Sequence, residues 1–281
     1  MNVSLSRFNR NVEGRNTPIA VPLFIMALIS SLLLLLVGGS LFFFPDFARR
    51  RWLWTLTPFN TRFLGAIYLT ALVALTILLM ARRATLARLI VPMMWIFTTI
   101  ILLVSCSQIK QFDVHRRATG IWFWLYSADC IGASYYLGHY GRQTFSGLRK
   151  WSRGWSVYLR LQAVFLGIYG LGLLVLPVLF GGFWPWPLDT YHSQLYSAIF
   201  LTGAVGALML SRQTTAVELL ALGLIQVAFS SLVIAGVLVV DGVVHKIDWS
   251  LFGNWIWMGA IALLGITGLG MIGQSRQIPL T

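Results

Sequence analysis

Eight long apolar segments recur along this 281-residue chain, and they constrain its fold more than any other feature. A helix needs about 20 consecutive apolar residues to cross the hydrocarbon core of a membrane. The segments cover residues 20–44, 60–81, 89–108, 118–138, 158–182, 193–210, 216–240 and 251–273. They are apolar on every face and do not alternate with polar residues, so the pattern predicts spanning helices rather than the strands of a barrel.

The composition agrees with this prediction. Hydrophobic residues make up 58% of the chain and charged residues only 10%, whereas soluble domains carry roughly 25% charged residues. The net charge of +13 could suggest nucleic acid, but the Lys and Arg residues lie in short clusters between the apolar runs. Such clusters are typical of loops that fix membrane topology. We therefore predict an all-α integral membrane protein that contacts the lipid bilayer and binds no nucleic acid.

The distribution of positive charge predicts the orientation of the chain. If the N-terminus lies inside, 13 of the 21 Lys and Arg residues fall on the inner side and 8 on the outer side. Because cytoplasmic loops are enriched in Lys and Arg, both termini are expected in the cytoplasm, most simply at a bacterial inner membrane. Arg49, Arg50 and Arg51 oppose this bias. The first apolar run is too long for a signal peptide and is expected to be a retained helix.

Tryptophan residues gather at the predicted outer ends of the spans. An indole ring prefers the membrane–water interface, where its ring is half buried and its N–H finds a partner. We therefore interpret these residues as interfacial anchors. They are Trp52, Trp54, Trp122, Trp124, Trp184, Trp186, Trp255 and Trp257.

The two halves of the chain resemble each other. The segment RFLGAIYLTALVAL at 62–75 is similar to QLYSAIFLTGAVGA at 194–207, and RRATLARL at 82–89 is similar to RQTTAVEL at 212–219. The matches keep an offset of about 130 residues, which indicates a duplication. A unit of four spans is even, so two copies must be parallel. The predicted parts are an N-terminal tail (1–19), a first four-helix repeat (20–140), a basic linker (141–157), a second repeat (158–273) and a C-terminal tail (274–281).

Asp129 is the charged residue predicted at mid-depth in the membrane. It lies eleven residues into its span, roughly 16 Å at 1.5 Å per residue, close to the midplane of a core about 30 Å thick. A buried acid there must be paired, protonated or hydrated. We expect Asp129 to face the bundle interior and to be mostly protonated at neutral pH. Gln226 is the other polar residue near mid-depth, and it is either part of an ion site or a hydrogen-bonding contact between helices.

Two predicted outer loops carry groups that could bind a metal ion. His115 follows Asp113 in one loop, and His245 follows Asp241 in the other. Two His–carboxylate pairs meeting between the repeats could hold a divalent cation, although solvated loop residues would give the same pattern. Cys106 and Cys130 both fall inside predicted spans, so no disulfide or zinc site is expected. No cofactor is expected.

Two hypotheses for function follow from these residues. No reactive pair, catalytic triad or phosphate-binding loop is visible, so an enzyme is not expected. The first hypothesis is a non-catalytic accessory or scaffold protein that contacts other membrane subunits. The alternative is a small-solute or ion transporter, coupled to protons, that uses Asp129 at the interface between the repeats.

Overall fold

In the computed structural model, residues 18–141, 148, 150 and 152–277 are described. This part of the chain consists of helices and short connections, with one isolated bridge between Pro18 and Arg83. The long helices are α2 (Val21–Phe43), α4 (Pro58–Ala81), α5 (Ala84–Ser107), α6 (Arg117–Gly141), α7 (Arg153–Val175), α9 (Thr190–Arg212), α10 (Ala216–Val244) and α11 (Phe252–Gln277). The short ones are α3 (Pro45–Arg51), α8 (Pro177–Gly181) and the 3₁₀ turn η1 (Ile109–Gln111).

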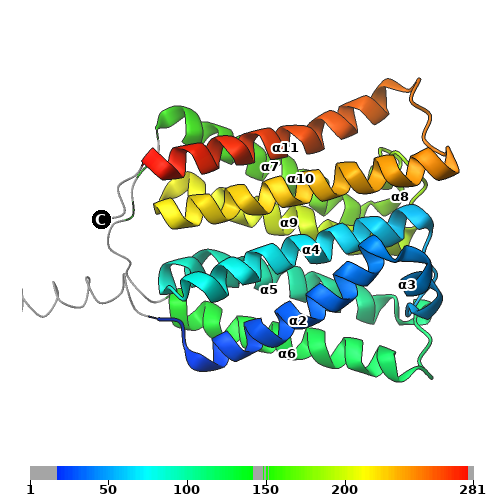
Figure 1. The fold of residues 1–281 in the computed structure, drawn as a ribbon, viewed down its shortest axis with the longest axis horizontal. Helices are drawn as coiled ribbons and strands as arrows, with labels where there is room; N and C mark the ends of the chain where they lie inside the picture. The colour runs from blue at the N-terminus through cyan, green and yellow to red at the C-terminus, as the bar shows by residue number, and fades with distance from the viewer. Residues whose placement is uncertain (1–17, 142–147, 149, 151, 278–281) are drawn as a thin grey trace, which may run out of the picture.

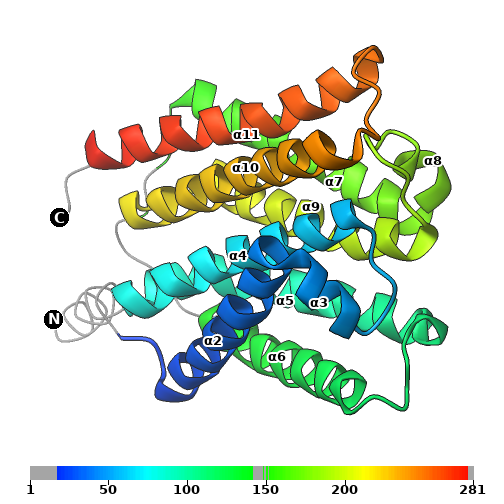
Figure 2. The same cartoon turned by 45° about the vertical axis from the view of Figure 1, so that its right-hand side comes forward.

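The long helices run side by side and alternate in direction (Figure 1). Helices α2, α5, α7 and α10 run one way, and α4, α6, α9 and α11 run the other way. Figure 2 shows α4, α5, α9 and α10 between the pair α2 and α6 on one side and the pair α7 and α11 on the other. We call the end where α2 begins and α11 finishes the terminal end. The opposite end, which carries α3 and α8, is the tryptophan end.

Seven helices are long and apolar enough to cross a membrane, namely all the long helices except α6. Helix α6 is also long enough, with 25 residues, but Asp129 and its Ser, Tyr and His residues lower its hydropathy. It lies against α5 and α2 and runs along the same axis as the others. The chain is thus an all-helical protein with several candidate spans. The eighth predicted span forms a helix but does not meet the composition expected of a span.

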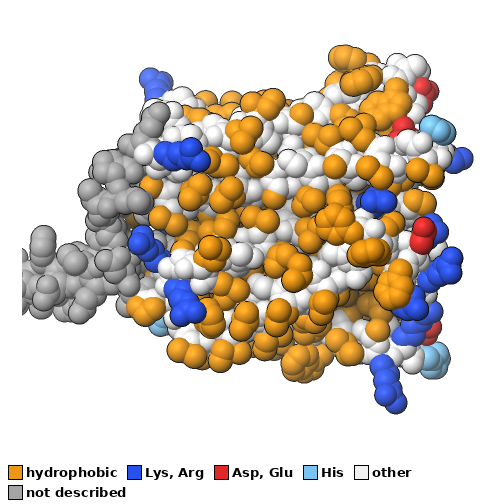
Figure 3. Space-filling view, viewed as in Figure 1, with side chains coloured by type: hydrophobic (Ala, Val, Ile, Leu, Met, Phe, Trp, Pro, Cys, Tyr) orange, Lys and Arg blue, Asp and Glu red, His pale blue; other side chains and the backbone are white. Residues whose placement is uncertain are grey.

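The surface between the two ends of the bundle is apolar. Most charged side chains on the face in Figure 3 gather toward the two ends, and hydrophobic side chains cover the band between them. Large apolar residues in this band are highly exposed, as at Met80 (81%) and Phe165 (80%). A continuous apolar surface of this kind is stable in lipid and not in water. The structure therefore supports a multi-pass membrane protein.

Helices α2 and α7 both stop at a break followed by proline. The residues at the breaks, Phe44 and Leu176, share one backbone conformation, with φ −125° and ψ 56° at Phe44 and φ −123° and ψ 56° at Leu176. Pro45 and Pro177 then open α3 and α8, because proline fits the first turn of a helix but interrupts one already formed. The predicted span at 158–182 therefore ends earlier than expected, at Val175.

Helices α4 and α9 begin with equivalent caps. The Thr57 hydroxyl accepts the Asn60 N–H at 3.2 Å, and an Asp189 carboxylate oxygen accepts the His192 N–H at 2.8 Å. Each cap satisfies a backbone donor that the first turn would leave unpaired. Asp189 follows Thr57 at the same spacing as Pro177 follows Pro45.

The close helix crossings are also paired. A Cβ added at Gly38 in α2 would lie 3.2 Å from the backbone N of Leu69 in α4, and one added at Gly170 in α7 would lie 3.1 Å from the backbone N of Leu201 in α9. Small residues at these positions let the backbones approach closely. Helix α4 packs on α10 in the centre of the bundle, and α9 packs on α5.

Candidate functional site

A cavity of about 380 Å³ lies inside the bundle, and each of the eight long helices contributes to its lining. Most lining side chains are aliphatic or aromatic. A volume of a few hundred Å³ with an apolar lining and a few polar groups is typical of small-molecule sites. Its polar lining includes Ser30, Asp129, Gln162 and Gln226, and Arg51 and Trp52 line it at the tryptophan end.

Asp129 lines this cavity, as the sequence predicted for an acid at mid-depth. The Ser30 hydroxyl of α2 lies 3.1 Å and 3.2 Å from the two Asp129 carboxylate oxygens and donates to them. The structure shows no ion pair to Asp129 among the described residues. An acid held by one hydroxyl beside a cavity can exchange a proton or accept a cation.

Gln226 in α10 and Gln162 in α7 also line the cavity. Each residue is 6% exposed, and neither side-chain amide has a hydrogen-bond partner within the described part of the protein. Gln226 was expected to form either an ion site or a contact between helices; it does not donate to or accept from a neighbouring helix. The sequence interpretation missed Gln162, because it lies within one turn of Arg160, a charge expected at the end of a span.

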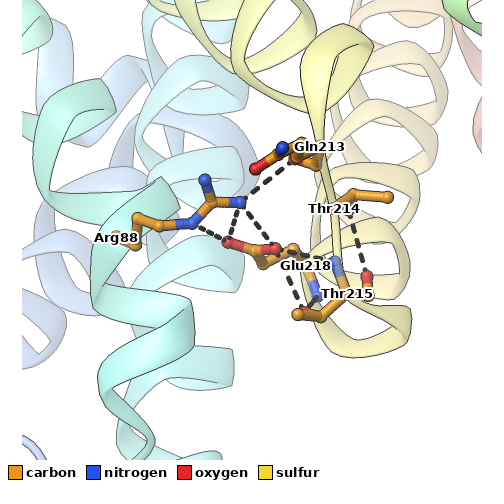
Figure 4. Close-up of polar contacts among 5 residues, drawn as sticks. All are labelled: Arg88, Gln213, Thr214, Thr215 and Glu218. Atoms are coloured by element: carbon orange, nitrogen blue, oxygen red, sulfur yellow. Dashed lines mark hydrogen bonds and ion pairs between the residues drawn. The ribbon is translucent and has the colours of Figure 1, made fainter. Parts of the chain in front are cut away.

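An ion pair closes the packing between α5 and α10 at the terminal end (Figure 4). Arg88 Nε lies 2.8 Å from Glu218 Oε1, and Arg88 Nη2 lies 2.9 Å from Glu218 Oε2. Glu218 is fully buried and also accepts the Thr215 N–H at 2.8 Å, in a capping box at the start of α10. Ile90 and Leu222 line the cavity about one turn further along the same two helices. The pair therefore lies directly beyond the terminal end of the cavity.

Sequence reasoning placed Arg88 in a basic loop and did not single out Glu218. The available signal was Thr215-x-x-Glu218 directly before an apolar run, which is the pattern of a capping box. That pattern predicts the helix start. It does not predict the partner, because Arg88 reaches Glu218 only when α5 and α10 are packed together.

An aromatic cluster covers the tryptophan end. Trp54 Nε1 donates to His192 Nε2 at 3.2 Å, and Trp186 Nε1 donates to the Asn60 side-chain oxygen at 2.9 Å. These two contacts are reciprocal, because Trp186 follows Trp54 by the same number of residues as His192 follows Asn60. Each half of the chain thus supplies a tryptophan donor to the other half.

Burial separates the eight tryptophans that the sequence predicted as interfacial anchors. Trp54, Trp122, Trp184, Trp186 and Trp257 are each less than a tenth exposed and pack edge-to-face or tilted against other rings. Trp52 is partly buried in the same cluster. Their main contact is with protein, which differs from the expectation, because periodicity and position do not reveal which face of a helix meets its neighbours. Trp124 (69% exposed) and Trp255 (57%) have the exposure that an anchor requires.

The metal-binding candidates do not form a cluster. The Asp113 carboxylate pairs with Arg116 at 3.0 Å, and the Asp241 carboxylate accepts the backbone N–H groups of Lys246 and Ile247. Within the described ranges, no three His, Cys, Asp or Glu residues are placed to hold a metal ion. His115 and His245 lie in the connections that leave α5 and α10.

The counterpart of Asp113 is Asp248, not Asp241 as the sequence suggested. Asp113 accepts the His115 N–H at 3.2 Å, and its carbonyl accepts the Thr119 hydroxyl. Asp248 accepts the Ser250 N–H at 3.0 Å, and its carbonyl accepts the Asn254 amide. The expected pairing had followed the histidines, whereas the turn geometry follows these aspartates. At this spacing, the position in α11 that corresponds to Asp129 is Leu264, rather than the Ala262 that the sequence offset predicted.

No protein-family model matches the chain, and neither a characterised protein nor a solved structure is significantly similar to it. The function is therefore inferred from the cavity and from the groups that line and close it.

Proposed function

We propose that the protein crosses the membrane eight times, as two parallel four-helix repeats related by an axis along the membrane normal. The reciprocal Trp54–His192 and Trp186–Asn60 contacts support this arrangement, because a two-fold axis produces such an exchange. The equal breaks, caps and glycine crossings in the two halves support it too. In this proposal, α6 is the eighth span, and Asp129 faces the cavity instead of lipid.

We further propose that the protein is a small-solute transporter in a bacterial inner membrane, with both termini cytoplasmic. The observation that carries this proposal is the cavity between the repeats, lined by Asp129 and its single partner Ser30. Matched residues from both halves line the cavity, such as Leu34 with Leu166 and Phe97 with Phe229. Parallel repeats around a site at mid-depth are one of the architectures of secondary transporters.

In the proposed mechanism, Asp129 holds the coupling proton or cation. Ser30 keeps the carboxylate oriented into the cavity and leaves it without a fixed counter-ion. The Arg88–Glu218 pair closes the terminal end, and the aromatic cluster closes the tryptophan end. Alternate opening of these two layers would expose the cavity to one side at a time, which is how repeats that rock against each other transport a solute.

The scaffold hypothesis is less well supported by this geometry. A protein that only contacts other subunits requires no internal cavity, and an acid at mid-depth would be a cost without a use. No catalytic role is proposed either. Among the described residues that line the cavity, Asp129 is the only carboxylate and no histidine or cysteine lies beside it.

The test begins with the purified protein and a panel of small solutes. Solutes that raise its thermal unfolding temperature saturably are then added to proteoliposomes that contain the trapped pH indicator pyranine. We expect a solute-dependent pH change with the wild type and none with Asp129→Asn, which should still fold because an amide can pair with Ser30. Asp46→Asn is the matched control, because that carboxylate is 80% exposed at the tryptophan end.

Two results would contradict the transporter. One is an Asp129→Asn variant that retains the solute-driven pH change. The other is a wild type that responds to no solute but co-purifies with another membrane protein in fixed ratio, which would favour the scaffold hypothesis.

A further inference from the structure

The two unpaired glutamines mark a polar site that is distinct from Asp129. Gln162 and Gln226 are each 6% exposed, line the cavity, and have neither amide nitrogen nor amide oxygen paired with another described residue. A buried amide without a partner is unfavourable, because it has lost its bonds to water and gained none. Two such amides in one cavity indicate that a bound group completes their hydrogen bonds.

The corresponding positions of the first half show what is missing. By the spacing that relates the two halves, Ser30 corresponds to Gln162, and Asp129 corresponds to Leu264. Ser30 has its partner in Asp129, whereas Gln162 faces a cavity wall where leucine replaces the acid. Gln226 corresponds to Met94, which also lines the cavity but requires no hydrogen bond. The second half therefore carries amides where the first half is already satisfied.

Charge limits what the missing group can be. A primary amide offers two donors and one acceptor and carries no charge. Arg51 and Asp129 bring one positive and one negative formal charge to the rest of the lining, so the cavity has no clear preference for a charged ligand. The remaining lining is apolar, which suits an alkyl or aryl body.

We propose that the cavity binds an uncharged amphiphile, whose polar group both donates to and accepts from Gln162 and Gln226. Its apolar part fills the space between the two halves, near Phe97, Phe200 and Phe229. This inference deepens the proposed function, on which it rests, by giving the chemical class of the solute. The amides recognise the solute, and Asp129 supplies the coupling proton.

The experiment measures binding of tritiated decanamide to the full-length protein in lipid nanodiscs, with empty nanodiscs correcting for partition into lipid. Decanamide carries one uncharged donor–acceptor group on an apolar chain. We expect saturable binding that excess unlabelled decanamide displaces and that decylammonium and decanoate displace poorly. Gln162→Leu and Gln226→Leu should each weaken binding about tenfold, the effect of losing one hydrogen bond to the ligand.

Matched variants test whether the two glutamines themselves hold the ligand. Met94→Leu alters the corresponding position in the first half and should leave decanamide binding within about twofold, since it removes no hydrogen bond to the ligand. Asp129→Asn should also leave it unchanged, because the amides bind the polar group. The two glutamine variants should unfold at or above the wild-type temperature without ligand, because leucine removes an unsatisfied polar group.

The outcomes distinguish this inference from the proposed function. If decylammonium competes as well as decanamide, or if Asp129→Asn abolishes binding, the ligand is held by the acid and the inference is wrong. Absence of saturable binding, or a marked loss of stability in both glutamine variants, would show that the amides are structural. Saturable binding that requires both glutamines, without any solute-driven pH change, would uphold the inference and refute transport.

Discussion

The Glu218 carboxylate is buried but satisfied from several directions. Arg88 contacts both of its oxygens, and the backbone N–H and hydroxyl of Thr215 donate to one of them. Arg88 in turn donates to the Gln213 carbonyl at 3.1 Å. Removing one member of such a pair is much worse than removing both, because the remaining charge stays buried without compensation.

We therefore predict that Arg88→Met destabilises the protein by about 3 kcal/mol. The double variant Arg88→Met with Glu218→Gln should recover most of that loss, since glutamine keeps the capping box without a charge. Thermal unfolding in detergent, followed by size-exclusion chromatography, measures both. Equal stability of the single and double variants would mean that the ion pair is not formed in the membrane.

At the scale of single helices, close approach depends on which face a glycine occupies. Gly38 faces α4, where an added Cβ would lie 2.9 Å from the Tyr68 Cβ. Gly39 is its neighbour in sequence, but an added Cβ there meets nothing within 4 Å. The two glycines differ only in the face of α2 on which they lie, so they form a matched pair for testing the crossing.

Gly38→Ala should destabilise the protein by about 1–3 kcal/mol, because α2 must move away from α4. Gly39→Ala should be neutral or stabilising by about 0.5–1 kcal/mol, since alanine is the better helix former. Thermal unfolding temperatures of the two variants provide the test. If both alanine variants behave alike, α2 and α4 do not cross at Gly38.

The cap of α9 introduces a pH dependence at the tryptophan end. Burial alone would raise the pKa of the Asp189 carboxyl, but hydrogen bonds from the His192 ring and from backbone N–H groups outweigh it and lower the pKa. A carboxyl with a lowered pKa in the folded state stabilises the protein above its unfolded pKa of about 3.9, and this contribution is lost as the pH falls through the folded value. The effect is modest, because the Asp189 side chain is 60% exposed.

Asp189→Asn should therefore keep the cap, lose the contribution of the charge, and show a smaller drop in unfolding temperature between pH 6 and pH 3 than the wild type. Asp189→Ala should be less stable at pH 6 by about 1 kcal/mol, because it loses the cap itself. Thermal scans at both pH values compare the three proteins. A wild type and an Asn variant with equal acid sensitivity would exclude a role for this carboxylate.

Helix positions followed from hydropathy, and their exact ends did not. The segment predicted at 89–108 begins earlier, at Ala84, because the pairing of Arg88 with Glu218 allows a charged residue inside the first turns. The reverse holds for 158–182, where Pro177 ends the helix sooner. Hydropathy averages a window of residues, so it cannot register a single partner or a single proline.

For the whole molecule, the sequence predicted an acid that faces the interior but not the cavity around it. Asp129 was identified because a charge at mid-depth is rare. The unpaired state of Gln162 and the reciprocal Trp54–His192 contact depend on which helices are neighbours. No periodicity within one segment contains that information.

The central claim is that α6 crosses the membrane as one of eight spans, in two parallel repeats around the cavity. Reporter fusions after Gly14 and Gln274 test it most directly; Gly14 lies outside the described residues. An even number of spans places both reporters on one side, and the excess of Lys and Arg places that side in the cytoplasm. Both fusions should therefore be active only as cytoplasmic reporters. Reporters on opposite sides would mean seven spans and no parallel repeat, and would contradict this claim.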